Sequence, residues 1–284
     1  MGGFVLTAEN YYSMEANEAY YSASQIKQFM ECPACAMAEI RGEYERKKTA
    51  SLLVGGYIDA YFAGELDAFR RENPGIFTRV GTLKADYVQA EEIIARIERD
   101  PLAMRLLDGE KQRIVTGEIA GLPVKAKLDV WLDAEKARAI AADYPGMEAL
   151  TFADGAIVDM KVMKDFEPMY RQEEGRISFI EYWRYDLQMA IYQELMRQET
   201  GHLVPAFILA ASKQDPPGLT LVQIPQELLD FNLMQLTKRL PEYEEVKSGR
   251  EEPEACGKCA YCRKHHFLEG PQMAGMMLSL CKML

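Results

Sequence analysis

The stretch Ala156–Val162, AIVDMKV, places two charged side chains inside an apolar run. The run of Ala, Ile, Val and Met predicts a short buried strand. Asp159 and Lys161 stand two positions apart, and because side chains alternate along a strand, both point to the same face. A buried carboxylate or ammonium is costly unless a partner compensates its charge. We therefore expect a cation or an ion pair beside Asp159.

A second carboxylate comes from the segment before this strand. Residues 112–133, QRIVTGEIAGLPVKAKLDVWLD, alternate between apolar and polar side chains around an Ala-Gly pair, which predicts a hairpin. Asp129 stands near the end of the second hairpin strand, so pairing with AIVDMKV would bring it close to Asp159 and Lys161. Two carboxylates suit Mg²⁺ or Mn²⁺, and the lysine could hold a water or face phosphate charge. The alternative is an ordinary ion pair of Asp159, with Asp129 facing solvent.

The rest of the chain predicts one mixed α/β domain. It divides into a helical N-terminal part (1–110), a core (111–250) and a Cys-rich tail (251–284). Helices are expected from Ser22 or Ser24 onward, at 50–69, at 84–107 with a break before Pro101, at 176–200 and at 226–249. Further strands are expected at 205–213 and 218–225, and a loop is expected at 134–154.

Composition indicates a globular protein. The chain has 284 residues, of which 48% are hydrophobic and 27% charged. The net charge of −11 argues against a general nucleic-acid binder, although it allows a local basic channel. The longest apolar run, Leu203–Ala211, is shorter than the roughly 20 residues that span a bilayer, and the N-terminus lacks signal-peptide features. We expect a cytoplasmic protein without a membrane segment.

A third motif lies on the helix expected at 176–200. In YDLQMAIYQ, Gln188 and Tyr192 are spaced i, i+4 and share one helix face. The order Asp, then D-x-K, then Q-x-x-x-Y resembles the RecB-type branch of the PD-(D/E)XK nuclease superfamily, with phage RecE-like and lambda-type exonucleases nearest. Upstream, SASQIKQFMECP (22–33) resembles the opening of its iron–sulfur members. LLVGGYIDAYFAG (52–64) resembles the family's G-x-x-x-H segment, with Asp59 in place of the histidine.

The resemblance implies a restriction-endonuclease-like core, a small mixed sheet flanked by helices. It implies a metal-dependent DNA exonuclease that hydrolyses phosphodiesters in phage-type recombination or repair, using two Mg²⁺ or Mn²⁺ ions. The implied partners are DNA, with double-stranded ends as substrate, and a single-strand annealing protein. Lambda-type relatives form rings, so a homo-oligomer is a further expectation.

The resemblance also assigns roles to residues. Asp129 and Asp159 would bind metal, with the Met160 carbonyl and Asp59 as further ligands. Lys161 would position the attacking water. Gln188 would orient the site, and Tyr192 would contact DNA or the lysine. Candidates for the basic channel that holds DNA are Lys127, Lys164 and Arg184.

The sequence allows several other interpretations of Glu118 and of the function. Glu118 is either an additional site residue or a cross-strand partner of Lys125 or Lys127. The protein could be a non-catalytic DNA-binding module with a structural Cys–metal site, or a CRISPR- or RNA-linked nuclease of the same superfamily. It could also be a thiol–metal scaffold in which D-x-K is only an ion pair.

The cysteines form a second constellation. CGKCAYC places Cys256, Cys259 and Cys262 in a C-x₂-C-x₂-C pattern, which suits a metal or cluster that needs several thiolates. The resemblance implies that Cys32 is the fourth ligand and that the group is a [4Fe–4S] cluster tying the tail back to Cys32, although the family's usual spacing is C-x₂-C-x₅-C.

Two alternatives to the cluster remain. Cys35 forms a CPAC pair with Cys32, so a zinc site of Cys32, Cys35, Cys256 and Cys259 is possible. His265 and His266 are further candidate zinc ligands, and free thiols are the third reading. Cys281, in the apolar end of the tail, is expected to be a packed thiol.

Overall fold

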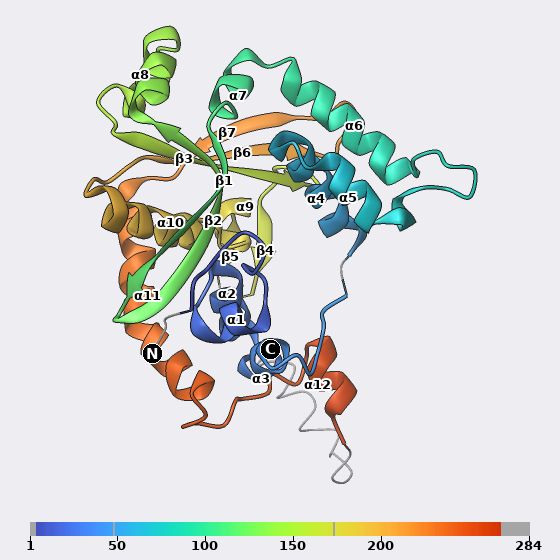
Figure 1. The fold of residues 1–284 in the computed structure, drawn as a ribbon, viewed down its shortest axis with the longest axis vertical. Coiled ribbons are helices and arrows are strands. Elements are labelled where there is room, and N and C mark those ends of the chain that lie inside the picture. Colours follow the sequence, from blue (N-terminus) through green and yellow to red (C-terminus); the bar gives the residue numbers. More distant parts are fainter. Residues whose placement is uncertain (1–3, 48, 173, 268–284) are drawn as a thin grey trace.

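A five-stranded mixed sheet with helices on both faces forms the centre of the protein (Figure 1). The computed structural model describes residues 4–47, 49–172 and 174–267; Cys281 lies outside them. The strands run in the order β1-β2-β3-β6-β7, and a separate two-stranded sheet contains β4 and β5. Their bounds are β1 Glu110–Ile119, β2 Leu122–Asp133, β3 Gly155–Met163, β4 Met169–Arg171, β5 Gly175–Ile177, β6 Ala206–Ser212 and β7 Leu219–Gln223.

The sheet confirms the pairing expected around AIVDMKV. β1 and β2 form the predicted hairpin, and Ala120 and Gly121 both have positive φ, as a tight two-residue turn requires. β2 pairs antiparallel with β3, and the last pair of this ladder is Val130 with Val158. β3 is parallel to β6 and β6 is antiparallel to β7.

Twelve α-helices surround the sheets in the part of the chain that the structure describes. Those before β1 are α1 Met14–Ala19, α2 Ala23–Glu31, α3 Pro33–Ile40, α4 Ala50–Ala63, α5 Leu66–Glu72, α6 Ala85–Glu98 and α7 Pro101–Leu106. Those after it are α8 Ala134–Asp143, α9 Phe179–Tyr182, α10 Tyr185–Thr200, α11 Gln226–Lys247 and α12 Ala260–His265. Short 3₁₀ turns lie at Pro74–Ile76 and Glu148–Leu150.

Most predicted helices are present, but three predictions were wrong. The single helix expected at 50–69 is divided, because Gly64 adopts a left-handed φ of 78° that ends α4 before α5 begins. The expected loop at 134–154 begins with α8, which Asp133 caps and which buries Ala137 and Ile140. The helix expected from 176 starts later, because Arg176 lies in β5 and Arg184 adopts a left-handed φ of 53° that separates α9 from α10. The break before Pro101 is confirmed, as is Ser22 as the cap of α2.

The sheet separates two hydrophobic cores. One lies against α2, α3, α10 and α11 and includes Phe29, Leu195 and Leu240. The other lies against α4, α6, α7 and α8 and includes Ile58 and Ile93. No helix of the described residues is long and apolar enough to cross a membrane.

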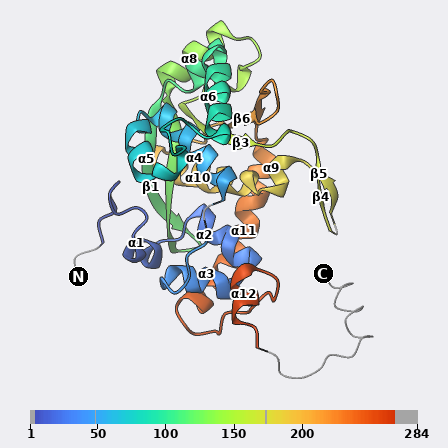
Figure 2. The same ribbon diagram turned by 90° about the vertical axis from the view of Figure 1, so that its right-hand side faces the viewer.

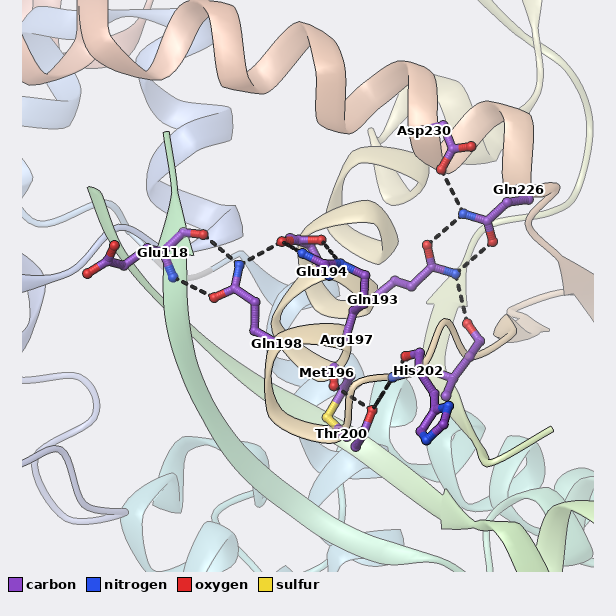
Figure 3. A network of polar contacts seen from close by, with 11 residues as sticks. Glu118, Gln193, Glu194, Met196, Arg197, Gln198, Thr200, His202, Gln226 and Asp230 are labelled. Atoms are coloured by element: carbon purple, nitrogen blue, oxygen red, sulfur yellow. Dashed lines mark hydrogen bonds and ion pairs between the residues drawn. The ribbon is translucent and has the colours of Figure 1, made fainter. Parts of the chain in front are cut away.

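Polar contacts fix α10 between the sheet and α11 (Figure 3). Gln198 accepts from the backbone N–H of Glu118 at 2.9 Å and donates to its carbonyl at 2.7 Å, which bonds α10 to β1. Gln193 and Gln226 exchange two hydrogen bonds of 2.9 Å, which joins α10 to α11. The first turn of α10, which carries Gln188, therefore has a fixed place beside the sheet.

Candidate active site

The candidate site forms where β2 and β3 stop pairing. Beyond Val158 the backbone N–H of Met160 has no backbone partner on β2. It donates instead to the side chain of Asp129, to Oδ2 at 3.0 Å. This contact holds the Asp129 carboxylate next to the backbone of β3. Asp159 and Lys161 leave the same face of β3, so the three side chains converge as the sequence pattern predicts.

Lys161 lies between the two carboxylates. Its Nζ forms an ion pair with Asp159 Oδ2, lies 3.8 Å from Asp129 Oδ2 and donates to the Met160 carbonyl at 3.2 Å. The Asp159 side chain is 1% exposed, and beyond the Lys161 ion pair its Oδ2 makes no hydrogen bond to the described residues. Two carboxylates and a backbone carbonyl around one buried position fit the all-oxygen ligand set of a hard divalent cation.

Gln188 and Tyr192 meet this group from α10. Gln188 Nε2 donates to Asp159 Oδ1 at 2.8 Å and to the Tyr192 hydroxyl at 3.2 Å. Lys27, on α2, donates to Gln188 Oε1 at 3.0 Å, and its Nζ lies 5.1 Å from the centre of the Tyr185 ring. Sequence reasoning missed Lys27 and Tyr185; the signal for Lys27 was its position inside SASQIKQFMECP.

The electrostatics of the site follow from burial and close charges. Burial and the Asp159 carboxylate raise the pKa of Asp129 to about 7. Burial and Asp129 raise the pKa of Asp59 well above its ordinary value. Burial opposes the charge of Lys161, but Asp159 and Asp129 outweigh it and raise the pKa of Lys161. Burial and Lys161 lower the pKa of Lys27 to about 7. The carboxylates are thus short of positive charge, which a divalent cation would supply.

Asp59 reaches the same site from α4. A cavity of about 490 Å³ is lined by Asp59, Asp129 and Asp159 together with Lys161, Gln188 and Tyr192. Lys125, Lys127, Tyr11 and Tyr12 also line this cavity, and Lys125 is buried, with its ammonium donating to the Tyr11 carbonyl and to Asn17. A second cavity, of about 960 Å³, shares Asp59 and Lys161 with the first and extends past Lys164 to Trp183. The carboxylates therefore lie between two open spaces that meet at Asp59 and Lys161.

Not every predicted site residue lies here. Lys164 lines the second cavity, and its side chain is 95% exposed. Arg184 lines a different cavity, beside Leu187 and Tyr243. Glu118 contacts Gln198 through its backbone (Figure 3), and it pairs with Pro123 next to the hairpin turn, six positions along β2 from Asp129.

Four cysteines form a second site between the two ends of the domain. The sulfur atoms of Cys32, Cys256, Cys259 and Cys262 all lie within 4.8 Å of one another. Cys32 ends α2, and Cys259 and Cys262 lie at the start of α12, which packs beside α3 (Figure 2). Cys35 is not in the group: its Sγ contacts Glu39 and Arg46. The four thiols could hold a metal, and of the predicted sets this one corresponds to Cys32 with the three tail cysteines.

Backbone N–H groups surround these sulfurs. Cys256 Sγ accepts from Cys259 N at 3.3 Å and from Lys258 N at 3.4 Å, and Cys32 Sγ accepts from Cys35 N at 3.4 Å. Burial raises the pKa of a thiol, but the N–H donors outweigh it and lower the pKa of Cys256 to about 7. Such donors stabilise thiolates, the form that binds metal.

Comparisons with known proteins give the family and the fold. The family described as "PDDEXK-like domain of unknown function (DUF3799)" matches residues 22–140 and 146–265. A crystal structure of a protein from Eubacterium rectale, named "Putative exonuclease", is similar with a TM-score of 0.86 and 40% sequence identity, covering 98% of this chain and 99% of that chain. No curated protein matches the sequence. The similarity confirms the expected mixed α/β, restriction-endonuclease-like fold.

Proposed function

The chain belongs to the PDDEXK-like family DUF3799, and we propose from its site that it is a metal-dependent DNA nuclease. The observation that carries the proposal is the convergence of Asp129, Asp159 and Lys161 at the point where β2 and β3 separate, with Lys161 between a buried Asp159 and a second carboxylate. An ordinary structural ion pair would need neither the second carboxylate nor an adjoining cavity of about 490 Å³.

The residues present fit divalent metal. Asp129, Asp159, the Met160 carbonyl and Asp59 would hold Mg²⁺ or Mn²⁺, and bound ions of this kind activate water and neutralise charge on a phosphodiester. Lys161 lies beside both carboxylates, so its ammonium can hold the attacking water and face the charge that develops on phosphorus oxygens. Gln188 donates to Asp159 Oδ1 and so fixes the orientation of the carboxylate, whose Oδ2 faces Lys161.

Basic and aromatic side chains around the two cavities support DNA as substrate. Lys127 lies 4.9 Å from the ring centre of Tyr12, and the Tyr12 side chain is exposed next to the first cavity. Lys164 and Trp183 border the second cavity. Lysines neutralise phosphates and exposed aromatic rings stack on bases. The exonuclease mode is proposed from the sequence resemblance and from the name of the Eubacterium rectale protein. The sequence resemblance alone supports the proposed role in phage-type recombination and the proposed annealing partner.

The cysteine group supports a structural metal. Four thiolates fit either a zinc ion or a [4Fe–4S] cluster. Their sulfur atoms all lie within 4.8 Å of one another, and the sequence resemblance favours the cluster.

Anaerobic purification discriminates between these two groups. A brown protein that contains iron and absorbs broadly in the visible would establish the cluster. A colourless protein with one zinc per chain would establish the single ion.

The decisive experiment for the enzyme uses end-labelled linear duplex DNA and a covalently closed circle. Wild-type protein is compared with Lys161→Met and with Lys238→Met, an exposed lysine on α11, in Mg²⁺, in Mn²⁺ and in chelator. We expect cleavage of the linear DNA that needs metal, survives Lys238→Met and falls at least roughly 10²-fold in Lys161→Met. Cleavage of the closed circle would replace the exonuclease mode with an endonuclease. Equal cleavage rates for Lys161→Met and wild type would refute the assigned site. If the protein binds DNA but cleaves neither duplex DNA, single-stranded DNA nor RNA, it is a DNA-binding module.

A further inference from the structure

The Lys27 ammonium donates a hydrogen bond to an uncharged amide. Its side chain is half-buried, and its one hydrogen-bond acceptor among the described residues is Gln188 Oε1, at 3.0 Å. A half-buried ammonium normally lies beside a carboxylate, because desolvation is otherwise costly. The contact therefore calls for an explanation other than stability.

The Gln188 amide is used at both ends. Its Nε2 donates to Asp159 Oδ1 at 2.8 Å and to Tyr192 at 3.2 Å, while its Oε1 accepts from Lys27. A reversed amide would place Oε1 against the Asp159 carboxylate, acceptor against acceptor, and Nε2 against the lysine. The nitrogen of a lysine carries protons in both of its protonation states, so Lys27 can always donate to Oε1.

We propose that Lys27 is a positioning residue of the active site, which turns the Gln188 amide so that Nε2 holds Asp159 Oδ1 and orients this carboxylate for the metal. This inference rests on the proposed function. Lys27 touches neither carboxylate and acts only through Gln188, as the outer partners of metal ligands do.

The scaffold keeps Lys27 in place. Ser22 caps the start of α2, whose Ile26 and Phe29 are buried in the core, and Cys32 ends the helix inside the thiol group. Lys27 is thus held on a helix that is fixed at both ends and packs beside α10.

A mutant cycle tests the proposal. Lys27→Met keeps the length of the side chain and removes the donor, Lys27→Arg keeps a donor, and each is made with Gln188 present and with Gln188→Ala. Mn²⁺ affinity without DNA, and kcat and KM on linear duplex DNA, are measured for each. We expect Lys27→Met to lower kcat and weaken Mn²⁺ binding roughly tenfold, with KM within about twofold. Lys27→Arg should recover most of both.

The cycle separates positioning from general damage. With Gln188→Ala, adding Lys27→Met should change kcat and Mn²⁺ affinity by less than about twofold, because the shared partner is gone. Wild-type values for Lys27→Met, or an undiminished effect in the Gln188→Ala protein, would overturn the proposal. Thermal melting by circular dichroism checks that the variants fold.

The two proposals can fail separately. If wild-type protein binds Mn²⁺ but cleaves no nucleic acid, the nuclease assignment fails and the Mn²⁺ affinities still decide the role of Lys27. If wild-type protein binds no Mn²⁺, both proposals fall.

Discussion

Asp129 lies beside Asp159 with its own carboxylate partly covered, and burial and the like charge raise the pKa of Asp129 to about 7. In the unfolded chain the same group titrates near 4. Between these values the folded protein holds a proton that the unfolded chain has lost. The free energy of unfolding of the metal-free protein should therefore fall as pH rises from about 4 to about 7, with a contribution of up to about 1.4 kcal/mol per pH unit from this group.

Urea unfolding in chelator at several pH values checks this prediction against Asp129→Asn. The variant cannot titrate, so its stability should decline less over the same range. Part of the decline should remain, because Asp59 also has a raised pKa. Parallel curves for the two proteins would contradict the assigned shift.

The residues of the site differ in how far sequence alone could reveal them. Asp159 and Lys161 follow from strand alternation, which is local, and Asp129 follows once the hairpin is recognised. Helical spacing places Gln188 and Tyr192 on one face, and the family resemblance assigned them to the site. Lys27 stands inside SASQIKQFMECP, but it meets Gln188 across 161 positions of sequence, so no local pattern encodes its role.

At the scale of elements, α2 joins the two sites of the molecule. Its last turn leads into Cys32, one of the four clustered thiols, and Lys27 on the same helix contacts Gln188. The metal proposed for the four thiols would tie the end of α2 to the tail cysteines, so its loss would release both. The cysteine group should therefore support activity although it lies away from the carboxylates.

Cys259→Ser and Cys35→Ser form a matched pair for this prediction. Cys259→Ser should lose the bound metal, lower the free energy of unfolding by about 3 kcal/mol or more and reduce cleavage. Cys35→Ser should keep the metal, because Cys35 contacts Glu39 and Arg46 instead of the cluster. Metal analysis, urea unfolding and the cleavage assay give the comparison. Full metal content in Cys259→Ser, or its loss in Cys35→Ser, would show that the ligand set is different.

The element boundaries that sequence missed have a common cause. α8 is a short helix in an Ala-rich stretch, which buries only Ala137 and Ile140 and so gives little periodicity. The break between α9 and α10 depends on the left-handed backbone of Arg184, a residue type that does not mark such a turn. In both places the tertiary structure decides what the local pattern leaves open.

Over the whole molecule, the net charge is negative, but lysines lie along the two cavities. The chain carries −11, yet Lys127 borders the first cavity and Lys164 the second. The negative surface elsewhere would repel DNA, so binding should depend on these two lysines and weaken steeply with salt. The carboxylates lie between the two cavities, which suits a strand that passes from one cavity to the other.

Lys127→Ala, Lys164→Ala and Arg184→Ala test this distribution by fluorescence anisotropy with labelled DNA in Ca²⁺, over a range of salt concentrations. Each lysine variant should weaken binding roughly three- to tenfold and reduce the salt slope by about one, as expected for the loss of one phosphate contact. Arg184→Ala should bind as wild type does, because Arg184 lines a different cavity, although the sequence placed it with the lysines. Weak binding by Arg184→Ala together with unchanged binding by both lysine variants would instead place the DNA path along the cavity beside Tyr243.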